Sequence, residues 1–168
     1  MIEKILQEIS DMETRLKEIT DTNDEMISKK IIGITEIIDK FLKEMSLPEE
    51  TKNEFSNNFS KNWREVDLSL RNTNKTLLKK VREILMPVRQ LLSSISLDEE
   101  NKAKDSVELI CGRGEEIIEK IQKEAGEMTD SWTNELENFF IDSENELKID
   151  LSKFAGDHGI NFNPESFP

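Results

Sequence analysis

Apolar side chains recur every three or four residues along most of the chain, which is the spacing of one face of an α-helix. Steps of four around Asn23 resemble a stutter, an insertion that locally unwinds a coiled coil without ending it. Asn23 is then a polar core position, which fixes register at a cost in stability. A loop at residues 21–24 that divides the series into two helices is the alternative. The series comprises Ile2, Ile5, Ile9, Met12, Leu16, Ile19, Ile27, Ile31, Ile34, Ile38, Phe41 and Met45.

A second helix is predicted after Leu47, where Pro48 is followed by Glu49 and Glu50. Proline suits the first helical position, and acids in the first turn interact favourably with the helix dipole. Pro87 lacks the amide that would bond the carbonyl of Glu83, so we expect a kink or a break there. The apolar series of this helix is Phe55, Phe59, Trp63, Val66, Leu70, Leu77, Val81, Ile84, Val88, Leu91 and Ile95. Thr73 occupies the core position between Leu70 and Leu77.

A third helix is predicted from residues 96–100, where a serine cap precedes three acids within four residues. Gly112 and Gly114 weaken it, because each glycine costs about 1 kcal/mol relative to alanine in a helix. Regular structure should end near Ala155, since two glycines and a proline follow within ten residues. The apolar series is Ala103, Val107, Ile110, Ile117, Ile121, Ala125, Met128, Trp132, Leu136, Phe139, Leu147, Leu151 and Phe154.

Three long helices joined by short connections predict an all-α fold, an elongated antiparallel three-helix bundle of the coiled-coil type. Its single domain covers residues 1–155, and residues 156–168 form an irregular C-terminal tail. The alternative is a bundle of four or five helices, broken at Asn23, Pro87 and Gly112–Gly114. If the chain folds back on itself at its two predicted turns, Phe55 lies at the same height along the bundle as Phe41, Phe139 and Phe140. Trp63 then lies at the same height as Ile32 and as residues near Trp132.

The three predicted helical segments differ in net charge. The chain has a net charge of −13, and residues 48–96 are its only basic segment, with nine basic and six acidic side chains. Residues 97–168 carry seven basic and nineteen acidic side chains, so the electrostatic field of the chain disfavours nucleic acid. We expect the basic stripe of the second helix to pair with acids of the third. The stripe comprises Arg71, Lys75, Lys79, Lys80, Arg82 and Arg89, and the acids are Glu115, Glu116, Glu119, Glu124 and Glu127.

Candidate chemistry is sparse in the sequence. The single histidine, His158, lies in a glycine-rich segment and is expected to be exposed. Cys111 lies beside the apolar series, which favours a half-buried, inert thiol. The acidic stretches that begin at Asp21 and Asp142 lack the glycine and the final glutamate of an EF-hand loop, so they are interpreted as helix surface. We therefore expect no catalytic residue, no cofactor and no metal site, and the enzyme class is excluded.

A non-enzymatic structural or protein–protein interaction module, a scaffold for partners not yet identified, is the function this pattern favours. Homodimerisation is one alternative, because apolar seams can also pair between chains. A lipid-surface-binding bundle, similar to the exchangeable apolipoproteins, is the other, although the acidic third helix and a narrow apolar stripe disfavour it. Partner docking is assigned to the C-terminal end of the third helix and the tail, with the tail packed on its own bundle as the alternative. The docking candidates are Leu151, Phe154, Ile160, Phe162 and Phe167.

The start of the chain resembles no targeting signal, because charges at Glu3 and Lys4 interrupt any apolar core. No apolar run approaches the roughly 20 residues that a membrane span needs. The expected compartment is the cytoplasm, and a mature secreted chain is the alternative.

Overall fold

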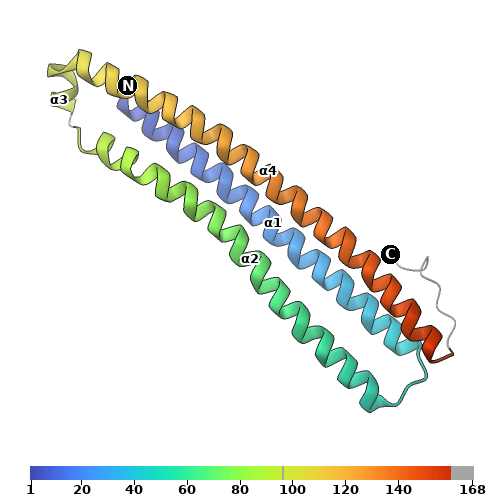
Figure 1. The fold of residues 1–168 in the computed structure, drawn as a ribbon. Helices are drawn as coiled ribbons and strands as arrows, with labels where there is room; N and C mark the ends of the chain where they lie inside the picture. Colours follow the sequence, from blue (N-terminus) through green and yellow to red (C-terminus); the bar gives the residue numbers. More distant parts are fainter. Residues whose placement is uncertain (96, 160–168) are drawn as a thin grey trace. The chain divides into compact units, whose positions relative to one another are not determined.

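The computed structural model describes residues 1–95 and 97–159, without the side chains of residues 97, 98 and 100. Four helices follow one another: α1 (Ile2–Glu44), α2 (Glu49–Ser93), the six-residue α3 (Leu97–Lys102) and α4 (Lys104–Asp157) (Figure 1). Within these ranges no strand is present. The predicted all-α class is therefore confirmed, and the three long helices are consistent with a three-helix bundle.

The helices continue through each of the three positions at which the sequence suggested a break. α1 passes through residues 21–24, so the loop alternative is wrong, and Asn23 is buried as predicted, with 4% of its surface exposed. α2 passes through Pro87, whose ring is exposed while Leu85 and Leu92 on either side are fully buried. α4 likewise passes through Gly112 and Gly114. Burial of an apolar face supplies most helix stability in proteins, and here it outweighs these local penalties.

The helix ends are set by local backbone chemistry. The carbonyl of Pro48 accepts the first hydrogen bond of α2, from the amide of Lys52 at 3.1 Å, and Glu49 and Glu50 occupy the first turn. α4 ends at Asp157, two residues later than predicted, where Gly159 adopts a φ of +67°. This left-handed conformation terminates helices and is accessible to glycine at little cost.

One break was not foreseen. The predicted third helix is divided at Ala103 into α3 and α4, so the connection after α2 includes residues 94, 95 and 97–103. The residues of α4 that face α2 consequently lie later in the chain than a turn at residue 96 would place them.

The described chain forms two compact units, and the three long helices each contribute a segment to both. Unit 1 comprises residues 1–23 and 73–132, and unit 2 comprises residues 24–72 and 133–159. The expected single domain of residues 1–155 stays a prediction. The core of unit 1 contains Ile2, Ile5, Ile9, Met12, Leu16, Val81, Leu85, Leu92, Val107, Cys111, Ile118, Ile121 and Ala125. A core cluster of unit 2 contains Ile38, Phe41, Leu42, Met45, Leu151 and Ala155.

Aromatic contacts in unit 2 correct the predicted register. The ring of Trp63 lies 6.5 Å from that of Phe139 and 6.4 Å from that of Phe140, between centroids. Phe154 lies 5.6 Å from Phe55, the residue that was expected opposite Phe139 and Phe140. The expected α4 partners of Trp63 and Phe55 are therefore wrong, by about two and four helical turns, because the α3 connection was not anticipated. Phe41 and Phe55 both contact Phe154, which agrees with their expected common level.

The core-facing residues of α2 and α4 also differ from the prediction. Leu85 and Leu92 are buried on α2, whereas Ile84 and Leu91, which the heptad pattern assigned to the core, are exposed. On α4, Cys111 and Ile118 are buried in place of Ile110 and Ile117. In each case two apolar or nearly apolar residues are adjacent in sequence. Spacing alone then fits either of two neighbouring helix faces, and only packing decides between them.

Candidate functional site

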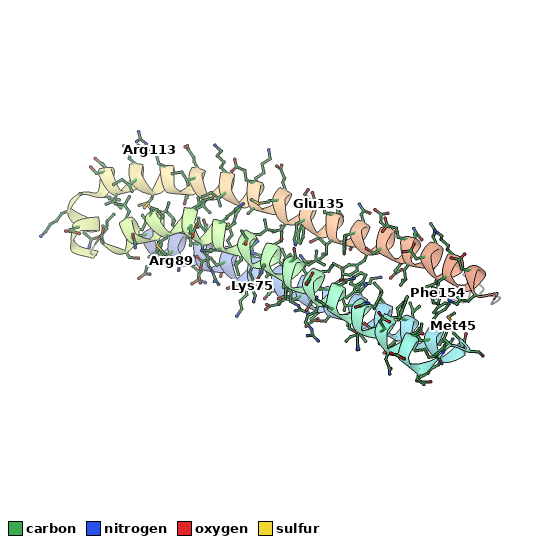
Figure 2. The ribbon with its side chains drawn as sticks, turned by 60° about the horizontal axis from the view of Figure 1, so that its bottom comes forward. Met45, Lys75, Arg89, Arg113, Glu135 and Phe154 are labelled. Carbon is green, nitrogen blue, oxygen red and sulfur yellow. The ribbon has the colours of Figure 1, made fainter. Side chains whose placement is uncertain are left out.

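The two described docking candidates at the end of α4 are covered by other helices. Leu151 is 1% exposed and belongs to the core cluster of unit 2. Phe154 is half-buried, with its ring centroid 6.3 Å from that of Phe41 and 5.6 Å from that of Phe55 (Figure 2). Contacts with α1 and α2 therefore cover both side chains, and their docking role stays a prediction. The later register of α4 places them opposite α1 and α2.

The other three docking candidates, Ile160, Phe162 and Phe167, lie outside the described residues, so their docking role stays a prediction. His158, the single histidine of the chain, is exposed as expected. Its ring lies 4.3 Å from that of Phe154, and its Nδ1 lies 2.9 Å from the carbonyl oxygen of Phe154. These contacts hold the imidazole against the end of α4.

Cys111 lies deeper than expected. Its side chain is 1% exposed and belongs to the core of unit 1, and its thiol is not in a disulfide. A cysteine packed in this way behaves as a small apolar residue.

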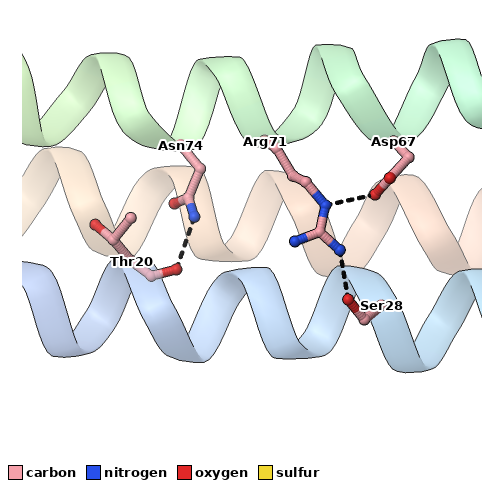
Figure 3. A network of polar contacts seen from close by, with 5 residues as sticks. All are labelled: Thr20, Ser28, Asp67, Arg71 and Asn74. Carbon is pink, nitrogen blue, oxygen red and sulfur yellow. Dashed lines mark hydrogen bonds and ion pairs between the residues drawn. The ribbon is translucent and has the colours of Figure 1, made fainter.

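The basic stripe of α2 finds partners on α1 and on its own helix. Arg89 pairs with Glu13 of α1 at 3.1 Å, and Lys79 lies 3.9 Å from Glu83. Arg71 pairs with Asp67 at 2.7 Å and donates a further hydrogen bond to Ser28 of α1 (Figure 3). For these three cations the expected partners on α4 are wrong, because Arg71 and Arg89 contact α1 and Lys79 pairs within α2.

A layer of buried polar side chains joins α1 to α2 within unit 1 (Figure 3). Asn74 is 1% exposed, and its side-chain amide donates to the backbone carbonyl of Thr20 at 2.7 Å. The amide of Asn23 approaches the side-chain oxygen of Asn74 at 3.5 Å. We call these three residues the polar layer. The sequence pattern identified Asn23, but it placed Thr73 rather than Asn74 in the core position of α2.

Exposed apolar residues of unit 1 repeat at heptad spacing on two helices. On α2, Ile84 and Leu91 are 54% and 56% exposed. On α4, Ile110 and Ile117 are 36% and 46% exposed, and Met128 follows eleven residues later at 37%. We call these five residues the exposed seam. The sequence pattern assigned these residues to the core, although the adjacent pairs Ile84–Leu85 and Leu91–Leu92 indicate that α2 carries two apolar lines.

A shallow depression of about 220 Å³ lies between α1 and α4 of unit 1. Most of its lining is apolar, and the hydroxyl of Thr129 at its edge is already bonded to the carbonyl of Ala125 at 2.9 Å. Specific small-molecule sites combine such a lining with a few converging polar groups. The depression fits an apolar side chain better than a polar ligand.

The acidic stretches considered for calcium are helical. Residues 21–25 belong to α1 and residues 142–146 to α4, so neither follows the course of an EF-hand loop. Across the described ranges, no three His, Cys, Asp or Glu side chains are grouped so that they could hold a metal ion.

The fold and these contacts define a class, the all-helical proteins built from long packed helices. Comparison with protein-family models, with curated proteins and with solved structures finds no match in any of the three. None of the helices, over the residues described, is sufficiently long and apolar to span a membrane.

Proposed function

We propose that this chain is a non-enzymatic structural and protein–protein interaction module, an acidic scaffold built on an elongated, antiparallel bundle of the coiled-coil type. The antiparallel course of α1 and α2 is supported by their contacts in unit 1. Glu13 pairs with Arg89, whereas Thr20, later in α1, pairs with Asn74, earlier in α2. The four-residue connection between the two helices favours the same course.

The exposed seam is the observation that carries the proposal. Its residues recur at the spacing with which one helix packs against another, yet each leaves more than a third of its surface in water. Exposed apolar residues that recur along one helix face mark surfaces that bind partners, and a partner helix would take the pair on each helix as anchors at i and i+7.

The occupant proposed for the seam is a protein, with a second copy of this chain as one case. The strongly acidic residues 97–168 favour protein partners over nucleic acid, whose phosphates they repel. The cytoplasm is the proposed compartment, and a buried Cys111 that forms no disulfide suits it.

Two glutamate substitutions in the seam test the proposal. Leu91→Glu and Ile117→Glu alter exposed side chains, so both variants should keep the helical circular dichroism of the unmodified chain. Each chain is immobilised and exposed to a lysate of the cells that produce it, and the captured proteins are quantified by mass spectrometry. Proteins held by the unmodified chain and lost from both variants support the proposal. Sedimentation velocity on the same chains reports whether the partner is a second copy.

The matched control is Leu109→Glu. Leu109 is 60% exposed on another side of α4, and its replacement adds the same charge. This variant should retain the captured proteins. Equal capture by all four chains, or equal loss from the control, would contradict a role for the seam.

A lipid-surface-binding bundle is the second candidate, and one observation favours it. Ile84 with Leu85, and Leu91 with Leu92, place apolar residues on two neighbouring lines of α2, so its apolar sector is broader than a narrow coiled-coil seam. Broad apolar sectors suit helices that lie on lipid. Vesicles of zwitterionic phosphatidylcholine test this candidate, with the fluorescence of Trp63 and Trp132 as the signal. A blue shift with co-sedimentation would favour lipid binding, and unchanged emission would favour the interaction module.

A further inference from the structure

The described chain buries four polar side chains. They are Thr20, Asn23, Asn74 and Thr129, and all four belong to unit 1. Burial of a polar group is costly unless it is hydrogen-bonded, so each of these groups needs a partner beside it at the same height along the helices.

Their hydrogen bonds divide them into two kinds. The hydroxyls of Thr20 and Thr129 donate within their own helices, to the carbonyls of Leu16 at 2.8 Å and Ala125 at 2.9 Å. The amides of Asn23 and Asn74 instead make contacts between α1 and α2, with each other and with the backbone carbonyl of Thr20. Of these four side chains, only those of the two asparagines therefore make hydrogen bonds that depend on how α1 is aligned with α2. At the surface, the Glu13–Arg89 ion pair depends on this alignment as well.

The remaining core of unit 1 constrains this alignment weakly. Its α1 residues are isoleucine, methionine and leucine at steps of three and four, and such residues pack similarly after a shift of one heptad. A shift of seven residues in one direction would bring Leu16 opposite Asn74, and the opposite shift would bring Val81 opposite Asn23. In the first shift Asn74 faces an apolar side chain that offers no hydrogen bond, and in the second shift Asn23 does.

We propose that the Asn23–Asn74 contact is a register lock, which selects one alignment of α1 against α2 and lowers the stability of the bundle in return. Buried asparagines perform this role in coiled coils, where they specify register and oligomeric state. The lock acts within unit 1 and is independent of the partner proposed for the exposed seam.

The double variant Asn23→Leu/Asn74→Leu tests the lock. Its melting temperature should rise by several degrees, because two buried amides are replaced by apolar groups of similar size. Its amide NMR spectrum should show more than one set of signals, or its sedimentation more than one mass, where the unmodified chain shows one. A single set of signals at the unmodified mass, a lower melting temperature or loss of the helical signal would each overturn the proposal.

A relocated pair provides the rescue. Leu16 and Val81 are both buried in the core of unit 1. Leu16 lies seven residues before Asn23 and Val81 seven residues after Asn74, so Leu16 and Val81 lie opposite each other when the two helices run antiparallel. Adding Leu16→Asn and Val81→Asn to the double variant should restore one set of signals. Signals that stay multiple would contradict the lock.

Thr129→Val is the matched control, since it removes a buried polar group whose hydrogen bond stays within its own helix. The control should keep a single set of signals. Multiple signals from it would show that loss of any buried polar group disorders the bundle, and the proposal would then fail.

Discussion

Two adjacent residues of α2 have opposite environments. Leu85 is fully buried in the core of unit 1, whereas Ile84 is 54% exposed. The two side chains have nearly equal hydropathy, so the sequence does not distinguish them. A comparison of the two alanine variants therefore reports directly which apolar line of α2 faces the core.

Leu85→Ala should lower the free energy of unfolding by about 2–5 kcal/mol, since it removes a buried side chain and leaves a cavity. Ile84→Ala should change it by less than about 1 kcal/mol, because the site is largely in water. Urea denaturation followed by circular dichroism measures both. The reverse order would mean that α2 is rotated relative to the structure described.

Trp63 is half-buried among Phe59, Phe139 and Phe140 of unit 2. Trp63→Ala should destabilise the protein by about 2–3 kcal/mol, somewhat less than the roughly 3–5 kcal/mol typical of fully buried aromatic residues. Asn62→Ala, which alters an exposed neighbour, is the control and should be nearly neutral. A loss below about 1 kcal/mol at Trp63 would indicate that the aromatic contacts are not maintained in solution.

At the scale of the element, the helices are longer and less interrupted than local propensity suggests. A proline within a helix removes one backbone hydrogen bond and crowds the preceding turn. α2 nevertheless continues across Pro87, with buried leucines before and after it. The contacts of the whole apolar face maintain the helix where the local sequence would end it.

Pro87→Ala tests this balance, because alanine restores an amide opposite the carbonyl of Glu83. The free energy of unfolding should rise by about 1–3 kcal/mol, the helix penalty of proline less the entropy it removes from the unfolded chain. Thermal unfolding measures the change. Met86→Ala, at an exposed neighbouring position, should leave the melting temperature nearly unchanged. A lower melting temperature for Pro87→Ala would show that the proline is required where it stands.

At the scale of the whole molecule, the elongated bundle proposed above has a direct consequence in solution. A compact domain of this length has a radius of gyration of about 15 Å, whereas helices of more than 40 residues that remain straight require a clearly larger value. Small-angle X-ray scattering on the unmodified chain measures it. A radius near the compact value would refute the elongated arrangement and place bends within the long helices.

The sequence by itself determined the helical class and, to within two residues, the start of α2 after Pro48 and the end of α4 before Gly159. It predicted the buried position of Asn23 as one of two alternatives. These features depend on neighbours within about one turn, namely the 3.6-residue period, capping and the conformational range of glycine and proline. The exposed seam, the pairing of Asn23 with Asn74 and the position of Phe154 were decided only by the tertiary structure. Where apolar residues are adjacent, two helix faces satisfy the same spacing, and the choice between them depends on contacts with helices distant in sequence. The break at Ala103 then shifts every facing residue of α4, which no local pattern encodes.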